Sequence, residues 1–445
     1  MKKQKTTEEF IGSFAYDNRL APYDIQGSIA HALMLGKRHI IPANSVKKIV
    51  RGLESILEDL KKGWKLPFEE DIHFAIEREL IRRTGDHGKM LHTGRSRNDQ
   101  VITDVLLYVK DQFRLIIREI VLLEKALIEI SESHRDVVMP GFTHLQHAQP
   151  VLFAHHMLAY AWMLERDKGR FKDALKRADV MPLGSAALAG TSFPIDRAMT
   201  AKLLGFSAIS ENSIDATGSR DVIVELVAAS SILMSNLSRL AEELIIWSSS
   251  EFSFIQLATE FTSGSSIMPQ KRNPDVAEII RGETGRVYGD LIALLTILKG
   301  LPLSYNRDLQ EDKPPLFDAA DTLMGCLSVM APMIRTMKVN TASLKRWCDV
   351  GFLAATELAD YLAEKGVPFR AAHGVVREVV RYCKEKGVRF DQLSISELRQ
   401  FHKKFDTNAL ELLTPEKVVR AKTSYGGTSP ASVRRQIEKL KKFLR

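Results

Sequence analysis

One stretch of the chain combines small hydroxyl residues, a lysine and two prolines, and it leads into a segment with helical periodicity. It extends from Thr262 to Asp275 and reads TSGSSIMPQKRNPD. Because proline disrupts a helix interior, the stretch is predicted to be a loop, with Asn273 as the N-cap of a helix over 276–298. The positive end of a helix dipole behind a flexible loop favours a bound anion. The loop is therefore a candidate anion site, and an ordinary surface loop with a helix cap is the alternative.

The loop and its neighbours also contain the residue types of acid–base catalysis. Ser265 would act as a base only if its alkoxide were strongly stabilised, since a free serine hydroxyl barely ionises near neutral pH. Loop N–H groups, Lys271 and the helix N-terminus are the kinds of group that supply such stabilisation. His144 titrates in the useful range, and Glu278, early in the following helix, would orient it. These residues predict acid–base chemistry on an anionic substrate.

Two further polar clusters stand at the ends of predicted helices. HTGRSRNDQ spans 92–100 and PGFTHLQHAQP spans 140–150. Each alone is explained by helix capping or a turn, but a helical bundle would bring such helix ends together. The stretches 181–191 and 303–313 are interpreted as structural turns.

Long amphipathic helices are predicted to position these clusters. Apolar residues recur at intervals of three and four over 101–131, 221–247 and 276–298, and another helix is predicted over 151–176. Leu115 and Val121 are apolar but lie off the main stripe, which indicates that subunits pack through the bundle. We predict an all-α fold in three parts: an N-terminal helical domain at 1–95, a central long-helix bundle at 96–348 and a small helical C-terminal domain at 349–445.

Composition excludes several other classes. The 445 residues are 45% hydrophobic and 27% charged, as in soluble globular proteins, and the charge of +8 alone is weak support for nucleic-acid binding. No apolar run reaches the ~18 residues of a membrane span, and none follows the basic start, so we expect a cytoplasmic protein without membrane contact. The three cysteines lack metal-ligand spacing, and neither HExxH, GxxxxGK[ST], GxGxxG nor GxSxG occurs, so neither a metal nor a cofactor is predicted.

Residues 264–274, GSSIMPQKRNP, resemble the signature loop of the fumarase/aspartase superfamily. Gln270 after the loop proline, together with 92–100 and 184–194, makes the chain similar to the argininosuccinate lyase family in particular. The likeness extends over about 13–436 and includes GFLAATELADYL at 351–362. It implies reversible cleavage of argininosuccinate to fumarate and arginine, without a cofactor. It also implies a homotetramer with a 20-helix core and active sites that are each built by three subunits.

The resemblance also implies roles for individual residues. Ser265 would take the proton next to a succinyl carboxylate, and Lys271, Asn273 and loop N–H groups would stabilise the resulting aci-carboxylate. His144, paired with Glu278, would assist proton delivery to the departing guanidino nitrogen. The remaining substrate contacts carried over by position are Ser13, Ser96, Arg97, Asn98, Thr143, Tyr305, Gln310 and Lys313.

Two departures and three alternatives accompany this resemblance. Relatives usually carry a Trp-Gly-Gly-Arg-Phe segment near the start, which residues 1–10 lack, and His147 stands where many relatives have arginine. One alternative is another lyase of the superfamily, such as adenylosuccinate lyase. A second is a non-catalytic scaffold like the lens crystallins of this family, against which the joint presence of His144, Ser265, Lys271 and Glu278 argues. The third, nucleic-acid binding, rests on net charge alone.

Overall fold

The structure, a computed structural model, describes residues 6–444, apart from the side chain of Glu8. It is 69% helical with little strand, which confirms the predicted all-α class. The chain forms two compact units. The first unit comprises Met1–Arg118, Asp167–Met234 and Glu283–Gly325, and the second comprises Glu119–Arg166, Ser235–Gly282 and Cys326–Arg445. The three-part division at residues 95 and 348 stays a prediction.

Long helices account for much of the chain, and four of them were predicted from the sequence. They are α7 (Arg97–Ser133), α8 (Phe153–Ala178), α11 (Asp221–Ser248) and α12 (Asp275–Leu298). A further long helix, α13 (Lys313–Thr336), was not predicted. Its buried apolar residues follow alternating steps of four and three, which places them on one helix face: Leu316, Ala320, Leu323, Leu327, Met330 and Ile334.

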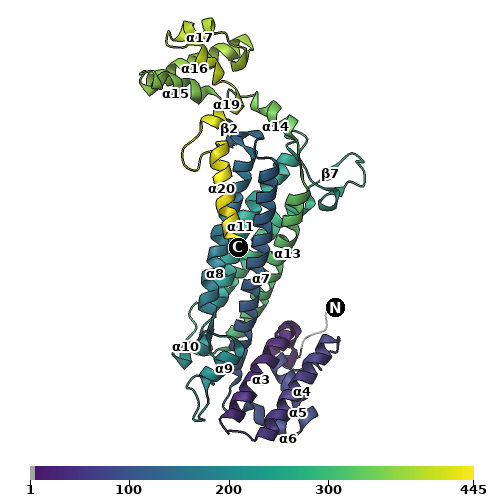
Figure 1. Cartoon of the computed structure of the whole chain (residues 1–445). Coiled ribbons are helices and arrows are strands. Elements are labelled where there is room, and N and C mark those ends of the chain that lie inside the picture. Colours follow the sequence, from purple (N-terminus) through teal and green to yellow (C-terminus); the bar gives the residue numbers. More distant parts are fainter. Residues whose placement is uncertain (1–5, 445) are drawn as a thin grey trace. The chain divides into compact units, whose positions relative to one another are not determined.

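In the first unit, several helices pack around an apolar core. α3 (Ala21–Lys37) contacts α4 (Ala43–Lys61), α5 (Ile72–Thr84) and α9 (Arg197–Leu204), and Figure 1 shows α3, α4 and α5 side by side. Asp71 caps α5 by accepting the Phe74 N–H at 2.6 Å, and Gly85, with φ of 63°, ends it. The smaller elements are α1 (Thr7–Ile11), α2 (Phe14–Asp17), η1 (Asn18–Leu20), α6 (Asp86–Lys89), η2 (Met90–His92), β3 (Val180–Met181), β4 (Ala208–Ile209), α10 (Ser213–Gly218) and η4 (Arg307–Asp312).

The second unit contains the longest strands. β1 (Val138–Thr143) and β2 (Gln146–Leu152) form an antiparallel hairpin with a bulge between Pro140 and Phe142. Two-residue ladders join β5 (Ile255–Gln256) to β8 (Lys338–Val339), and β6 (Ser263–Gly264) to β7 (Arg272–Asn273).

A compact group of helices follows, with Leu358, Leu362, Leu398 and Phe405 in its core. Figure 1 shows α15, α16 and α17 gathered in this part of the second unit. The elements from residue 341 onward are α14 (Thr341–Cys348), α15 (Ala355–Glu364), α16 (Phe369–Lys386), η5 (Phe390–Gln392), α17 (Ile395–Phe401), α18 (Thr407–Glu411), α19 (Pro415–Ala421) and α20 (Pro430–Phe443). The second unit also contains the short turn η3 (Thr259–Phe261).

All three cysteines are buried, and none forms a disulfide within the described chain. Burial raises the pKa of the Cys348 thiol to about 12 and that of Cys383 to about 11, so neither is a reactive thiolate at neutral pH.

Two helical segments, α11 and Arg307–Thr336, are long and apolar enough to cross a membrane by length and composition alone. Half or more of each apolar window (50% and 56%) is buried inside the chain. Core helices of soluble proteins have the same property.

Candidate active site

Six of the residues predicted to contact substrate line one cavity of about 230 Å³ in the first unit. They are Ser13, Arg97, Asn98, Tyr305, Gln310 and Lys313. The rest of the wall consists of Asp17, Glu70, Asp71, His73, Val101 and Arg307. Residues from three distant parts of the sequence therefore meet at one place, and both signs of charge are present.

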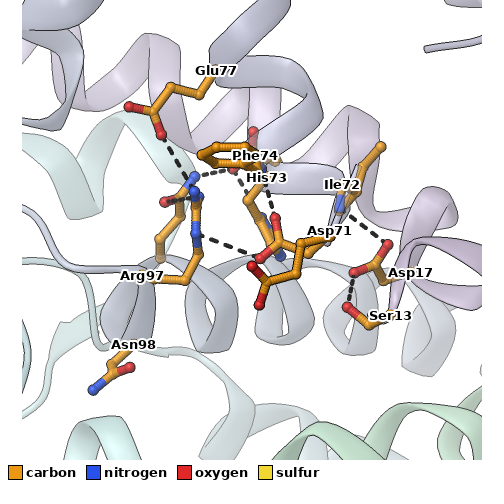
Figure 2. A network of polar contacts seen from close by, with 12 residues as sticks. Ser13, Asp17, Asp71, Ile72, His73, Phe74, Glu77, Arg97 and Asn98 are labelled. Carbon is orange, nitrogen blue, oxygen red and sulfur yellow. Dashed lines mark hydrogen bonds and ion pairs between the residues drawn. The ribbon is translucent and has the colours of Figure 1, made fainter. Parts of the chain in front are cut away.

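Arg97 lies in the first turn of α7, where the neighbouring side chains hold its guanidinium in place (Figure 2). It donates to Gln100 Oε1 at 2.8 Å and to Glu77 Oε2 at 3.3 Å, and its Nε lies 3.7 Å from Asp71 Oδ2. The Asn98 amide donates to the Ala187 carbonyl at 3.1 Å. The side chains of Gln100, Glu77 and Asp71 fix the direction of the Arg97 guanidinium. An arginine held in this way can bind a carboxylate through two N–H groups.

Ser96 precedes this helix and has a local role in the structure. Its Oγ accepts the Asn98 N–H at 3.2 Å, and its own N–H donates to Asp99 Oδ1 at 3.0 Å. Ser96 is not among the residues of the cavity wall.

A second set of contacts organises the side of the cavity near Ser13. The Ser13 hydroxyl donates to Asp17 Oδ2 at 2.6 Å, and the Ile72 N–H donates to Asp17 Oδ1 at 3.2 Å (Figure 2). Burial raises the pKa of Asp17, although the charge of His73 and the bond from Ser13 oppose this. Gln310 donates to the Ile11 carbonyl at 3.0 Å, so the N-terminal segment lies against the same wall.

Lys313 belongs to a buried charge triad. Its Nζ lies 3.0 Å from Asp312 Oδ1, and Arg220 Nε donates to Asp312 Oδ2 at 2.5 Å. Arg220 and Asp312 are each 1% exposed in their side chains, so the carboxylate offsets the charge of a fully buried arginine as well as that of Lys313 in the cavity wall. Tyr305, also in the cavity wall, has its pKa raised by burial and therefore remains a neutral hydroxyl.

In the cavity wall, His73 Nδ1 lies between two buried carboxylates, 3.2 Å from Asp24 Oδ1 and 3.1 Å from Asp104 Oδ2. Burial alone would lower the pKa of His73, but hydrogen bonds to Asp104 and Asp24 and their charges raise it to about 10. Burial and the charge of Asp24 raise the pKa of Asp104 to about 7.

Among the described residues, Asp24, His73 and Asp104 lie close enough together to hold a metal ion. A proton on His73 already supplies positive charge between the two carboxylates, and we interpret the trio as an ion network. His73 Nε2 has no partner among the described residues.

In the second unit, the predicted loop is closed at its base by the β6–β7 ladder, in which Ser263 pairs with Asn273 and Gly264 with Arg272. The expectation that Asn273 caps the following helix is wrong, because Asn273 is held in β7 and α12 begins at Asp275. Asp275 Oδ2 instead accepts the Ser263 N–H at 2.7 Å across the loop base. Hydrogen bonds from the Ser263 side chain and N–H lower the pKa of Asp275, so the bond is charge-assisted at neutral pH.

Ser265 is the first residue of the loop beyond that ladder, and two backbone groups point at its hydroxyl. Its Oγ accepts the Ile267 N–H at 3.3 Å and the Met268 N–H at 3.1 Å. Two donors aimed at one oxygen stabilise negative charge on it. Lys271 lies farther along the loop, with its side chain exposed to solvent.

His144 and Leu145 form the two-residue turn of the β1–β2 hairpin. Their φ angles are 56° and 55°, a left-handed conformation that side-chain-bearing residues rarely adopt. Strain of this kind concentrates at functional sites. Thr143, His144 and Glu278 are exposed, and among the described residues no hydrogen bond or ion pair joins His144 to Glu278. Their predicted pairing stays a prediction.

Cavity-wall residues that sequence reasoning did not select include Asp71, His73 and Arg307. Asp71 had a usable signal, because it directly precedes an apolar-periodic segment as an N-cap does. A buried histidine such as His73 carries no comparable signal in one sequence.

Comparison with known proteins places these features in a family. The family described as "Lyase" matches residues 1–289, and "Argininosuccinate lyase C-terminal" matches residues 352–420. The argininosuccinate lyase of Symbiobacterium thermophilum is 53% identical, over 97% of this chain and 94% of that protein. That of Citrifermentans bemidjiense is 52% identical, over 98% of this chain and 96% of that protein. A crystal structure of EDDS lyase in complex with formate superposes with a TM-score of 0.88 at 28% identity, covering 96% of this chain and 87% of that one.

The helical fold and these matches define a lyase of the fumarase/aspartase superfamily. Within it, the chain belongs to the argininosuccinate lyase family, which confirms the resemblance found in the sequence. Other branches of the superfamily are not favoured.

Proposed function

We propose that the protein catalyses the reversible cleavage of argininosuccinate to fumarate and L-arginine, a step of arginine biosynthesis. The observation that carries this proposal is the 53% identity to an argininosuccinate lyase over 97% of the chain. Acid–base chemistry by the chain's own side chains accounts for the reaction.

Ser265 is the base in this proposal. Its alkoxide takes a proton from the carbon next to a succinyl carboxylate. Before this proton transfer, the N–H groups of Ile267 and Met268 stabilise the negative charge on Ser265 Oγ. Lys271 and Asn273 stabilise the aci-carboxylate that forms. The carbon–nitrogen bond then breaks, and His144, oriented by Glu278, delivers a proton to the departing guanidino nitrogen.

The cavity of the first unit binds the substrate in this proposal. Argininosuccinate carries carboxylates and cationic nitrogen groups, and the wall offers Arg97 and Lys313 for the former and Glu70 and Asp71 for the latter. The uncharged contacts in this cavity are assigned to Ser13, Asn98, Tyr305 and Gln310. Ser96 and Thr143, which are not in its wall, are proposed as further contacts on the family resemblance alone.

The assembly is proposed to be a homotetramer that shares its active sites. On α12, Tyr288, Ile292 and Leu295 are 43%, 62% and 47% exposed, at steps of four and three along one face. Side chains added at Gly285 and Gly289 would meet open space, so another helix could approach closely there. An uncovered apolar helix face of this kind indicates a partner, and a second copy of the chain fits the family. Four chains of 50.0 kDa would give about 200 kDa by light scattering. We place the enzyme in the cytoplasm, where activity would appear in the soluble fraction.

The test follows the ultraviolet absorbance of fumarate after addition of argininosuccinate or adenylosuccinate. The parent is expected to cleave only argininosuccinate, and Ser265→Ala is expected to lose that activity with unchanged circular dichroism. If the intact, tetrameric parent cleaves neither substrate, the proposal fails in favour of a non-catalytic scaffold. If it cleaves adenylosuccinate instead, the substrate assignment fails.

A further inference from the structure

The base of the β1–β2 hairpin has a backbone donor that the hairpin itself does not satisfy. The Phe153 N–H donates to the Val137 carbonyl at 2.8 Å, and neighbouring N–H groups of an extended chain point to opposite sides. The Leu152 N–H therefore points away from β1, and Leu152 is buried. A buried N–H requires an acceptor. Thr428 Oγ1 supplies it at 2.8 Å, from a position 276 residues farther along the chain.

A tight turn between α19 and α20 presents Thr428 to the hairpin. The Gly427 N–H donates to Ser424 O at 2.8 Å, and the Ser429 N–H donates to Lys422 O at 3.2 Å. Gly426 has φ of 80°, and a Cβ on Gly427 would lie 2.6 Å from Lys422 O. Glycine is therefore required at both positions. Ser429 follows the turn and is the N-cap of α20, with its side chain accepting the Ser432 N–H.

The turn is anchored on both sides. Before it, Lys422 forms an ion pair with the buried carboxylate of Glu357 in α15. After it, Gln436 of α20 accepts from Trp162 Nε1 at 3.2 Å, and Trp162 lies on α8, the helix that continues from β2. Thr428 is itself 5% exposed, so its hydroxyl lies in a packed, defined place.

Aromatic side chains hold another part of the hairpin. The His147 ring stacks on Trp347 with centroids 5.4 Å apart, and Trp347 stacks on Phe252 at 5.2 Å. The Thr428 bond adds a directional contact at the base of the hairpin, at the opposite end from His144.

We propose that Thr428 is a positioning residue for catalysis, which sets the direction of the hairpin that carries His144 by accepting the Leu152 N–H. The proposal rests on the proposed role of His144 as the acid. From Leu152 to the turn, the strand extends about 20 Å, so a tilt of about 3° at the base moves the tip by about 1 Å. A displacement of about 1 Å in a catalytic group lowers the rate by up to about 100-fold.

The experiment compares Thr428→Val, which removes the acceptor and keeps the shape, with Thr428→Ser, which keeps the acceptor. In the full-length enzyme, T428V is expected to lower kcat for argininosuccinate cleavage by at least about tenfold with little change in KM, and T428S to stay near the parent. A purely structural residue would lower the melting temperature without changing kcat in enzyme that is still folded. If T428V does not assemble, Gly426→Ala perturbs the same turn and replaces it in the comparison.

Thr428→Val made in a His144→Gln background separates the proposed role of Thr428 from the proposed role of His144 as the acid. If Thr428 acts through His144, T428V lowers kcat no further in H144Q. Retention of parental kcat by T428V, a further tenfold loss in H144Q, or an equal loss in T428S would each overturn the role of Thr428. Retention of parental kcat by H144Q would instead refute the proposed acid, and the role of Thr428 with it.

Discussion

The buried network around His73 predicts a specific dependence of stability on pH. We consider the double variant His73→Gln, Asp104→Asn, which removes the histidine cation together with one carboxylate. The remaining Asp24 carboxylate keeps the nearby Arg95 as a charge partner. The variant therefore contains no group of this network that titrates above neutral pH, and the difference from the parent isolates His73.

The magnitude follows from the shift in the His73 pKa. Hydrogen bonds and charges from the two carboxylates outweigh burial and raise this pKa from 6.5 to about 10. Because the His73 pKa is higher in the folded chain than in the unfolded chain, protonation of His73 stabilises the folded state. This stabilisation is complete below pH 6.5, the ordinary pKa, and is lost as pH rises to about 10, the pKa in the folded chain. Each pH unit in that window removes about 1.4 kcal/mol, so about 3 kcal/mol should be lost between pH 7.5 and 10. Asp104, with a pKa raised to about 7, adds little to the slope in this range.

Urea unfolding at equal protein concentration, measured for both proteins at pH 7.5, 8.5 and 10, tests this reasoning. The free energy of unfolding of the parent, minus that of the double variant, should fall by about 3 kcal/mol across the range. Tyrosine and lysine side chains titrate in both proteins and cancel in the difference. A difference that stays constant to within about 0.5 kcal/mol would show that His73 is not held as a cation.

Three further perturbations test other parts of the structure. Asp312→Asn leaves two buried cations without their shared carboxylate and should destabilise the protein by about 3–5 kcal/mol in urea unfolding, whereas an effect below about 1 kcal/mol would contradict the buried triad. Asp275→Ala removes the acceptor of the Ser263 N–H at the loop base and should lower kcat several-fold while circular dichroism stays unchanged; parental kcat would show that the loop is held by its ladder alone. Ile292→Glu places a charge on the exposed face of α12 and should reduce the mass measured by light scattering below about 200 kDa, and an unchanged mass would move the subunit interface elsewhere.

The long helices could be predicted because their apolar residues repeat over many turns. The same signal is present in α13, where the buried residues from Leu316 to Ile334 follow alternating steps of four and three. The β1–β2 hairpin had no comparable signal. Its turn residues, His144 and Leu145, are unlike the Asn-Gly or Asp-Gly pairs typical of such turns, so only the fold reveals their left-handed backbone.

The residue types of the site could be predicted from the sequence, whereas their arrangement in space could be predicted only in part. Arg97 and Lys313 were selected from position and resemblance, but the meeting of their segments in one cavity depends on tertiary packing. The capping role expected of Asn273 failed because strand pairing with Ser263 competes with the local preference for a helix cap. Backbone donors such as the Met268 N–H are present in every sequence, and only the loop conformation aims one at Ser265.

The burial of all three cysteines makes the native chain suitable for site-specific labelling. Thiol reagents react with thiolates that solvent can reach, and burial raises the pKa of Cys348 and Cys383 well above neutral. A cysteine introduced at Ile267, which is 86% exposed, would therefore be modified ahead of the native thiols. A fluorophore attached there would report movements of the 262–275 loop during turnover, in a protein from which no native cysteine has to be removed.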